Sequence, residues 1–297
     1  MTNLPNEPLT STAAAFGAAR ALSSHELTEE NKTEVLQFLS QRPLHTVVMN
    51  GFIRDNGLES PLNRGIFYGC RDRMGKLDGV ALIGHAMFLE VRSEYALEVF
   101  AQLAQEAGGT HMIMGEHSVI QKFWKYYSQR GQSPHRVCRE VLLALDQSPN
   151  RFAVVPHLRL ADPDDLAMVM PVHAALAFEE SGVDPLLTDP EGFQGRCRRR
   201  IEKGRVWVWI EEGQLIFKAD VISDTPEVIY LEGVFVNSDK RGKGYGTRCL
   251  SQLSQQLLRR THSISVLVSD DRHDAQRFFQ SVGFSARALY HTMFLQK

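Results

Sequence analysis

The sequence has few cysteines, and they are not spaced to act together. Four occur in 297 residues, and no two of them form a Cys-x-x-Cys pair. Disulfide scaffolds and zinc sites usually depend on closely spaced cysteines. The sequence therefore predicts no metal site and isolated, reduced thiols, as is usual in the cytosol. The four are Cys70, Cys138, Cys197 and Cys249.

Long apolar stretches and an excess of charge of one sign are also missing. No apolar run approaches the roughly 20 residues that span a bilayer. The net charge is -2, so no basic field points to nucleic acid. Residues 1–24 lack the basic start and apolar core of a signal peptide. We expect a soluble, cytoplasmic protein with a flexible N-terminal tail at residues 1–24 and neither a membrane nor a nucleic-acid partner.

The second half of the chain contains an alternation of helix and strand patterns. A polar, proline-bearing segment at residues 146–156 predicts a linker before it. Apolar periodicity and capping residues then predict the elements that follow. The first predicted helix ends at about Ser181, and the others span Glu191–Lys203, Thr247–Arg260 and Asp274–Val282. The predicted strands are Arg205–Ile210, Leu215–Val221, Val228–Val236, Ser263–Ser269 and Phe284–Leu295. This order predicts an α/β plan around a mixed sheet.

The first half repeats this order in outline. Its predicted strands are Gly65–Arg71, Leu77–Gly84, Ala86–Val91, Met112–Gly115 and Val137–Leu145, and its helices are Glu29–Arg42, Glu94–Ala107 and Val119–Gln129. The repetition indicates two copies of one fold, although two weakly similar halves can also arise by coincidence. We therefore expect two domains, at residues 25–148 and 153–297. Each is predicted to be a mixed, mostly antiparallel sheet flanked by helices.

A glycine-rich turn joins a predicted strand to a predicted helix in the second half. Residues 239–246 read D-K-R-G-K-G-Y-G. The free N–H groups of a helix's first turn point outward, and the helix dipole favours negative charge there, so such a junction binds phosphate well. The glycines keep side chains away from the backbone, and Arg241 and Lys243 add positive charge. The spacing fits neither the Rossmann fingerprint nor the P-loop.

This turn resembles motif A of the GNAT acetyltransferases, [Arg/Gln]-x-x-Gly-x-[Gly/Ala]. Arg241, Gly244 and Gly246 fill its fixed positions. The pattern alone is weakly specific, because chance yields it about 0.3 times in a chain of this length. Its context adds specificity: residues 275–284, A-x-x-F-F-x-x-x-G-F, resemble the family's motif B. The resemblance covers roughly residues 157–295.

The resemblance implies acetyl-CoA as the co-substrate. Backbone groups of the strand before the turn would line the pantetheine arm, and amides of the turn would hold the pyrophosphate. A bulge or splay near Gly233–Val236 would open the sheet for the acetyl group. The predicted cofactor-binding residues are Val234, Phe235, Val236, Arg241, Gly242, Lys243, Gly244, Tyr245, Gly246, Thr247 and Arg272.

Two positions depart from the family's pattern. Arg272 stands where the family often has Asn, and Phe279 stands where it often has a Tyr that acts as general acid. A phenyl ring cannot protonate the leaving thiolate, so water, Tyr290 or another group would have to do so. The same departures leave open a domain that binds CoA without catalysis.

Glu232 and Tyr290 are the predicted catalytic residues. Glu232 lies on the strand that leads into the turn, where some family members carry a general base; the alternative is an exposed or ion-paired strand glutamate. Glu179 and Glu180 fit a solvated helix end better than an acceptor site. His173, in the same predicted helix, fits a packing or surface histidine.

The function that the resemblance implies is an N-acetyltransferase acting by direct attack in a ternary complex. The acceptor would be a small-molecule or peptide amine; neither its identity nor the oligomeric state follows from the sequence. At the matching place in the first half stand Arg92–Ser93, without glycines, so the chain resembles tandem GNAT proteins with two GNAT-like domains and a degenerate first copy. Two alternatives stay open: a non-catalytic acyl-CoA sensor, and an aminoacyl-type transferase with paired GNAT-like domains.

Overall fold

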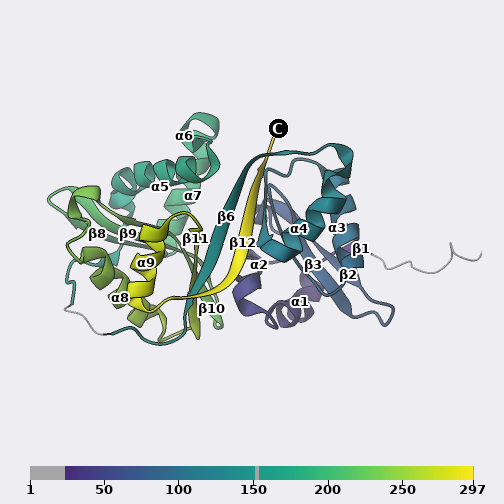
Figure 1. Cartoon of the computed structure of the whole chain (residues 1–297), viewed down its shortest axis with the longest axis horizontal. Helices are drawn as coiled ribbons and strands as arrows, with labels where there is room; N and C mark the ends of the chain where they lie inside the picture. Colours follow the sequence, from purple (N-terminus) through teal and green to yellow (C-terminus); the bar gives the residue numbers. More distant parts are fainter. Residues whose placement is uncertain (1–23, 151–153, 297) are drawn as a thin grey trace, which may run out of the picture.

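One mixed sheet of twelve strands runs through the computed structural model, which describes residues 24–150 and 154–296 (Figure 1). The predicted tail, except for Ser24, lies outside these residues. The strand order is β1-β2-β3-β4-β5-β12-β6-β11-β10-β9-β8-β7. The bounds are β1 Ser24–Glu26, β2 Gly65–Arg71, β3 Leu77–Gly84, β4 Ala86–Val91, β5 Met112–Glu116, β6 Pro134–Leu145, β7 Arg159–Leu160, β8 Val206–Glu211, β9 Gln214–Asp224, β10 Val228–Val236, β11 Ser263–Ser269 and β12 Ser285–Leu295. The pairs β4–β5 and β10–β11 are parallel, and the other pairs are antiparallel.

The two halves of the chain exchange their last strands. β6, the last strand of the first half, pairs with β11, with Glu140 opposite Ser269. β12, the last strand of the second half, pairs with β5, with Tyr290 opposite Glu116. β6 and β12 also pair with each other, and Figure 1 shows them side by side between the halves. Each half is therefore completed by the other half's strand, and the two predicted sheets are joined into one.

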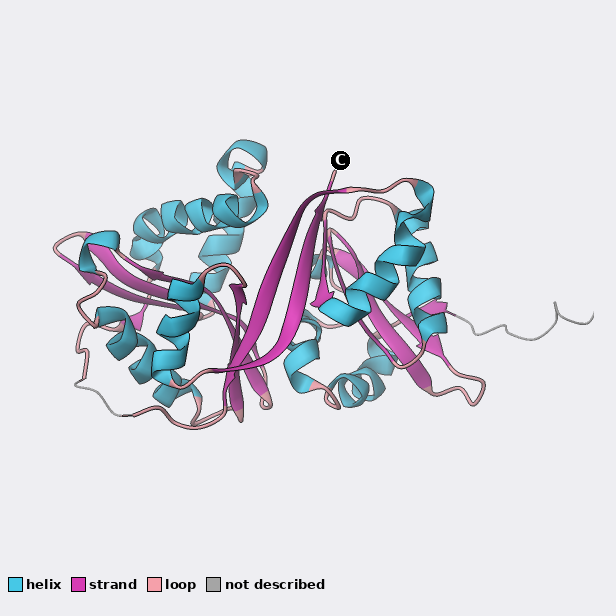
Figure 2. Ribbon diagram, in the orientation of Figure 1, coloured by secondary structure: helices cyan, strands magenta, loops and turns pink. Residues whose placement is uncertain are grey.

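Helices cover both faces of this sheet (Figure 2). Their bounds are α1 Lys32–Leu39, α2 Pro43–Asn56, α3 Glu94–Ala107, α4 His117–Tyr127, α5 Leu166–Ser181, α6 Pro185–Thr188, α7 Pro190–Glu202, α8 Tyr245–Leu257 and α9 His273–Val282. In the second half, α8 and α9 bury one core against β9, β10 and β11. On the opposite face, α5 and α7 bury another core against β8. Side chains that alternate along β9 and β10 therefore face two different helix layers.

Every strand predicted in the second half is present, and β10 and β11 match the prediction residue for residue. The bounds of β8, β9 and β12 differ from the predicted ones by one to three residues. The larger difference from the predicted elements lies in the first half. The helix predicted at Glu29–Arg42 ends at Leu39, and a second helix, α2, starts at Pro43. Proline at the first helical position loses no hydrogen bond, so Pro43 starts a helix here and does not merely stop one. No helix in the described parts of the chain is long and apolar enough to cross a membrane.

Candidate functional site

The strands β10 and β11 separate partway along their length. They pair in parallel from Val228 opposite Ser263 to Leu231 opposite Val266, and both strands then continue without pairing to each other. The register between β10 and β9 shifts between Glu232 and Phe235, which is a β-bulge. The opening predicted near Gly233–Val236 is therefore confirmed.

A buried lysine holds this bulge in place. Lys218 of β9 is fully buried, and its Nζ donates to the carbonyl oxygen of Gly233 at 3.0 Å and to Asp220 Oδ2 at 2.6 Å. Gly233 has a φ of 57°, and a Cβ added there would lie 2.7 Å from Lys218 Nζ. Glycine is thus required both for the backbone angle and for the space that the ammonium group occupies. Sequence reasoning did not identify Lys218 as part of the site.

The carboxylate of Asp220 contacts polar side chains from three elements. Besides Lys218, it accepts from Arg200 of α7 at 3.4 Å, and its Oδ2 lies 2.6 Å from Nε2 of His173 of α5. Burial opposes ionisation of Asp220, but Lys218 and then His173 hold its pKa well below the usual value. Burial is also the main reason why the pKa of His173 is lowered. His173 Nδ1 lies 3.2 Å from Cys197 Sγ, so the histidine is a buried packing residue, as expected.

A cleft of about 560 Å³ opens where β10 and β11 part. Its walls come from β9, β10, β11, α5, α7 and α9, and also from β6 of the first half. The predicted site residues Glu232, Val234, Phe235, Arg241 and Arg272 line this cleft. Its volume is in the range of small-molecule sites.

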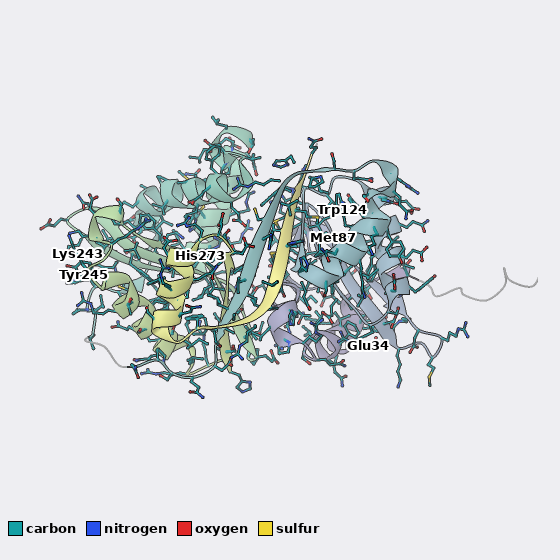
Figure 3. All side chains as sticks on the ribbon, in the orientation of Figure 1. Glu34, Met87, Trp124, Lys243, Tyr245 and His273 are labelled. Atoms are coloured by element: carbon teal, nitrogen blue, oxygen red, sulfur yellow. The ribbon has the colours of Figure 1, made fainter. Side chains whose placement is uncertain are left out.

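The glycine turn follows directly after β10. Figure 3 places Lys243 and Tyr245 on the side of the second half that faces away from the first half. Helix α8 begins at Tyr245 with Gly244 as its N-cap, at a φ of 76°, and no side chain caps it. Within the described residues, the N–H groups of Gly242–Thr247 have no acceptor. A row of free amides at an uncapped helix start can hold an anion such as a phosphate.

Several contacts tie the turn to the strand that precedes it. Arg241 Nε donates to the carbonyl oxygen of Val236 at 3.1 Å, and Lys243 Nζ donates to that of Asp239 at 3.0 Å. Gly246 is buried, and a Cβ there would lie 2.8 Å from a methyl group of Val236. This glycine therefore allows the start of α8 to pack closely on the end of β10.

Glu232 faces the cleft and forms no ion pair within the described residues. The carboxylate is accessible from the cleft, but the surrounding protein still raises its pKa by desolvation, against Arg200 and a hydrogen bond from Tyr230. Tyr230 lines the same cleft, and burial and then Glu232 raise its pKa well above the usual value. Sequence reasoning missed this tyrosine, whose place two residues before Glu232 was the available signal.

Arg272 and Phe279 lie on the α9 wall of the cleft. Arg272 Nη1 donates to Glu179 at 2.6 Å, and its Nε lies 3.4 Å from Asp274. Phe279 is 5% exposed and provides no proton donor. No group of three His, Cys, Asp or Glu residues in the described part of the chain is placed to hold a metal ion.

The structure does not bring Tyr290 to this cleft. Tyr290 is buried in β12 and its hydroxyl lies 2.9 Å from His45 Nδ1 of the first half. It lines a separate cavity of about 30 Å³ together with Arg42 and Glu116. The exchange of β12 into the first half is the physical reason, and the role predicted for Tyr290 as a proton donor is corrected accordingly.

Comparison with known proteins bears on this half of the chain. A family model described as acetyltransferase (GNAT) family matches residues 173–284, which contain the split strands, the turn and α9. Residues 173–284 form a GNAT domain. The cleft therefore lies where this domain meets β6 of the first half.

Solved structures share the fold of the whole chain. An acetyltransferase of the GNAT family from Colwellia psychrerythraea is 12% identical, with a TM-score of 0.56 over 93% of this chain and 100% of its own. A Drosophila protein is 12% identical, with a TM-score of 0.66 over 91% of this chain and 98% of its own. A tandem GNAT protein from the clavulanic acid biosynthesis pathway is 15% identical, with a TM-score of 0.56 over 91% of this chain and 97% of its own. No curated protein matches the sequence.

Proposed function

We propose that the protein transfers an acetyl group from acetyl-CoA to an amine in a ternary complex. One observation carries the proposal: the split between β10 and β11 opens beside a helix start whose amides are free. A diphosphate and an extended thioester arm need these two features side by side. The GNAT domain at residues 173–284 supports acyl transfer from an acyl-CoA in general.

The cofactor binds along β10 and the turn in this proposal. Among the residues that the structure describes, the edge of β10 that faces β11 has no strand partner beyond Leu231, so its backbone groups are available to the pantetheine amides. The amides of Gly242–Thr247 bind the pyrophosphate, and Arg241 and Lys243 add charge beside it. Arg272 also lines the cleft and is proposed to contact the same ligand.

Glu232 is the proposed general base. An amine attacks a thioester only as the neutral species, so its proton must go to a nearby acceptor. The raised pKa of Glu232 makes its carboxylate a better proton acceptor than an ordinary glutamate. The amine nitrogen bonds to the acetyl carbon, the C–S bond breaks, and CoA leaves as the thiolate. Because a thiol pKa is about 8.5, this leaving group does not require a tyrosine acid at Phe279.

One observation favours a second candidate, a domain that binds acyl-CoA without turnover. Phe279 lies on the cleft wall at a place where the family often has a proton donor. In that case acetyl-CoA would bind and no amine would be acetylated.

Two measurements on the purified chain separate these functions. Calorimetry with acetyl-CoA tests the cofactor site, and release of free CoA thiol with a panel of amines tests transfer. We expect binding and amine-dependent thiol release, with the release greatly reduced in Glu232→Gln. Binding without release for every amine would favour the non-catalytic candidate, and a lack of binding would contradict both.

A further inference from the structure

Two residues line both the cleft and the small cavity of the first half. Tyr230 of β10 and Leu267 of β11 contribute to the walls of the cleft of about 560 Å³ and also to those of the cavity of about 30 Å³. Tyr230 is 3% exposed and belongs to a small buried cluster, and the partly buried Leu267 packs against that cluster. The two side chains therefore form a partition between the two spaces.

Apolar side chains lie behind this partition. Val47 and Val48 of α2 and Leu142 of β6 line the cavity and not the cleft. Val47 belongs to the same cluster as Tyr230, and Leu142 lies opposite Leu267 in the pairing of β6 with β11. Charged side chains of the first half also line the cavity. The side of the cavity next to the partition is therefore apolar and suits an alkyl chain.

The partition stands at the point where β10 and β11 separate. Leu231 and Val266 are the last residues that pair, and Tyr230 and Leu267 lie directly beside them in the sequence. In the proposed function, the turn after β10 holds the pyrophosphate, and the thioester arm lies along β10 from its end back towards Leu231. An arm with this direction ends where the two strands separate. Its acyl group therefore meets the partition.

We propose that Tyr230 and Leu267 restrict the acyl group of the donor to acetyl. The two side chains block the methyl end of a longer acyl chain and close off the cavity behind them. A longer chain would have to displace a packed side chain, and overpacking of this kind is unfavourable. Tyr230 and Leu267 are therefore specificity-determining residues for the acyl-CoA. This inference rests on the proposed function, because that function places the thioester arm along β10.

The test compares acyl-CoAs of increasing chain length. Acetyl-CoA, propionyl-CoA and butyryl-CoA are titrated into the full chain by calorimetry, without an acceptor amine. The wild type should bind acetyl-CoA at least about tenfold more tightly than butyryl-CoA, with propionyl-CoA between them, because each added carbon presses on the partition. Affinity is measured instead of turnover, so the result does not depend on the identity of the acceptor.

Truncation of Leu267 should open the partition. Leu267→Ala removes three carbon atoms, and butyryl has two more than acetyl, so the preference for acetyl-CoA over butyryl-CoA should fall below about threefold. Leu267→Val removes one carbon atom and should relax the preference against propionyl-CoA, which has one more than acetyl. A thermal unfolding transition shows whether each variant is folded, and the milder Leu267→Val decides the question if Leu267→Ala is not.

Val48→Ala is the matched control. Val48 lines the cavity and not the cleft, so its truncation enlarges the space behind the partition without opening it. The preference for acetyl-CoA over butyryl-CoA should therefore stay at the wild-type value. A preference that relaxes as much in Val48→Ala as in Leu267→Ala would indicate a general loosening of the core and would contradict the role of the partition.

The outcomes separate this inference from the function on which it rests. Equal wild-type affinities for acetyl-CoA and butyryl-CoA would overturn the inference, because the longer chain would then extend into the open cleft. An unchanged preference in the folded Leu267 variants would overturn it as well. The expected preference without transfer to any amine would contradict the acetyltransferase and leave the inference standing. A lack of binding for every acyl-CoA would contradict both.

Discussion

The two parallel strand pairs of the sheet part in similar ways but lead to different spaces. β10 and β11 separate after Leu231 and Val266, and a cleft of about 560 Å³ opens between them. β4 and β5 separate after Met87 and Ile113, and the cavity there is about 30 Å³. The same strand geometry therefore gives an open site in the second half and a nearly filled one in the first. A split sheet alone is not sufficient for a ligand site.

Side chains explain the difference. In the first half, Arg42 at the start of α2 lies between the parted strands, with its guanidinium 2.5 Å from Glu116 and 3.3 Å from Glu90. Helix α3 is capped by Ser93, whose hydroxyl accepts from the Ala96 amide at 3.2 Å. The matching helix of the second half, α8, begins at glycine with free amides. In the described part of the first half, a serine-capped helix start and the Arg42 side chain therefore stand where the second half has a glycine turn and an open cleft.

The largest expected effect concerns Glu232, the carboxylate beside the opening between β10 and β11. Glu232→Gln removes the proposed base while keeping the shape of the side chain, so kcat/KM should fall by about 10²–10⁴-fold. Acetyl-CoA affinity should stay near the wild-type value, as measured by calorimetry. A loss of less than about threefold would remove Glu232 from the catalytic role.

Glu90, a carboxylate beside the opening between β4 and β5, should affect stability and not activity. Glu90 is 3% exposed and lies between Arg42 and Arg92. Glu90→Gln leaves Arg92 without its carboxylate partner and leaves Arg42 with Glu116 alone. The free energy of unfolding should therefore fall by about 1–3 kcal/mol, measured by urea titration. The activity of the folded fraction should not change. Strong loss of activity at unchanged stability would break the comparison between the two splits.

Substitutions at two glycines with similar backbone angles distinguish the effect of backbone strain from the effect on ligand binding. Gly244 in the turn has a φ of 76°, Gly131 after α4 has a φ of 86°, and neither has an atom within 4 Å of an added Cβ. Alanine at either site should cost about 1–2 kcal/mol of stability, because both need the left-handed conformation. Only Gly244→Ala should also weaken acetyl-CoA binding, by about tenfold, since relief of the strain displaces the amides. Equal affinities in the two variants would contradict the role of the turn.

The smallest expected effect is a difference in how the two splits respond to pH. Glu140 lines the cleft from β6, and burial raises its pKa to about 7 in the folded protein, so the stability it contributes is present below pH 4.5 and is lost as pH rises through about 7. The pKa of Glu116 in the first half is lowered, because its pairing with Arg42 outweighs burial. Its contribution is present above pH 4.5 and is lost as pH falls.

Thermal unfolding of two variants tests these opposite signs. Glu140→Gln should reduce the loss of thermal stability between about pH 5 and pH 8, and Glu116→Gln should reduce the loss below about pH 4. If both variants show the same dependence of thermal stability on pH as the wild type, the pKa shifts assigned to Glu140 and Glu116 would be contradicted.

The sequence predicted what depends on local pattern. The strands β10 and β11 and the glycine turn follow from alternation and from residues with special backbone angles, and the structure matches those bounds. The strand exchange could not be predicted from the sequence. β6 and β12 carry the same kind of alternation, and no local pattern specifies which sheet edge each strand joins. For that reason Tyr290 was misplaced, and Glu140 was missed as a residue that lines the cleft.

Buried charge was the other feature that the sequence could not predict. Lys218 stands within a strand among apolar residues, and its burial depends on Asp220 beside it and on His173 and Arg200 from two helices. A lone lysine in such a strand is normally read as exposed, because an unpaired buried charge is costly. Only the assembled fold brings these partners together.

In the proposed function, the opening between β10 and β11 binds acetyl-CoA and the opening between β4 and β5 does not. Calorimetric titration of the full chain with acetyl-CoA measures this directly through the stoichiometry. We predict one acetyl-CoA per chain, with the affinity reduced about tenfold by Gly244→Ala and unchanged by Gly131→Ala. Two bound molecules per chain, or no heat at all, would contradict it.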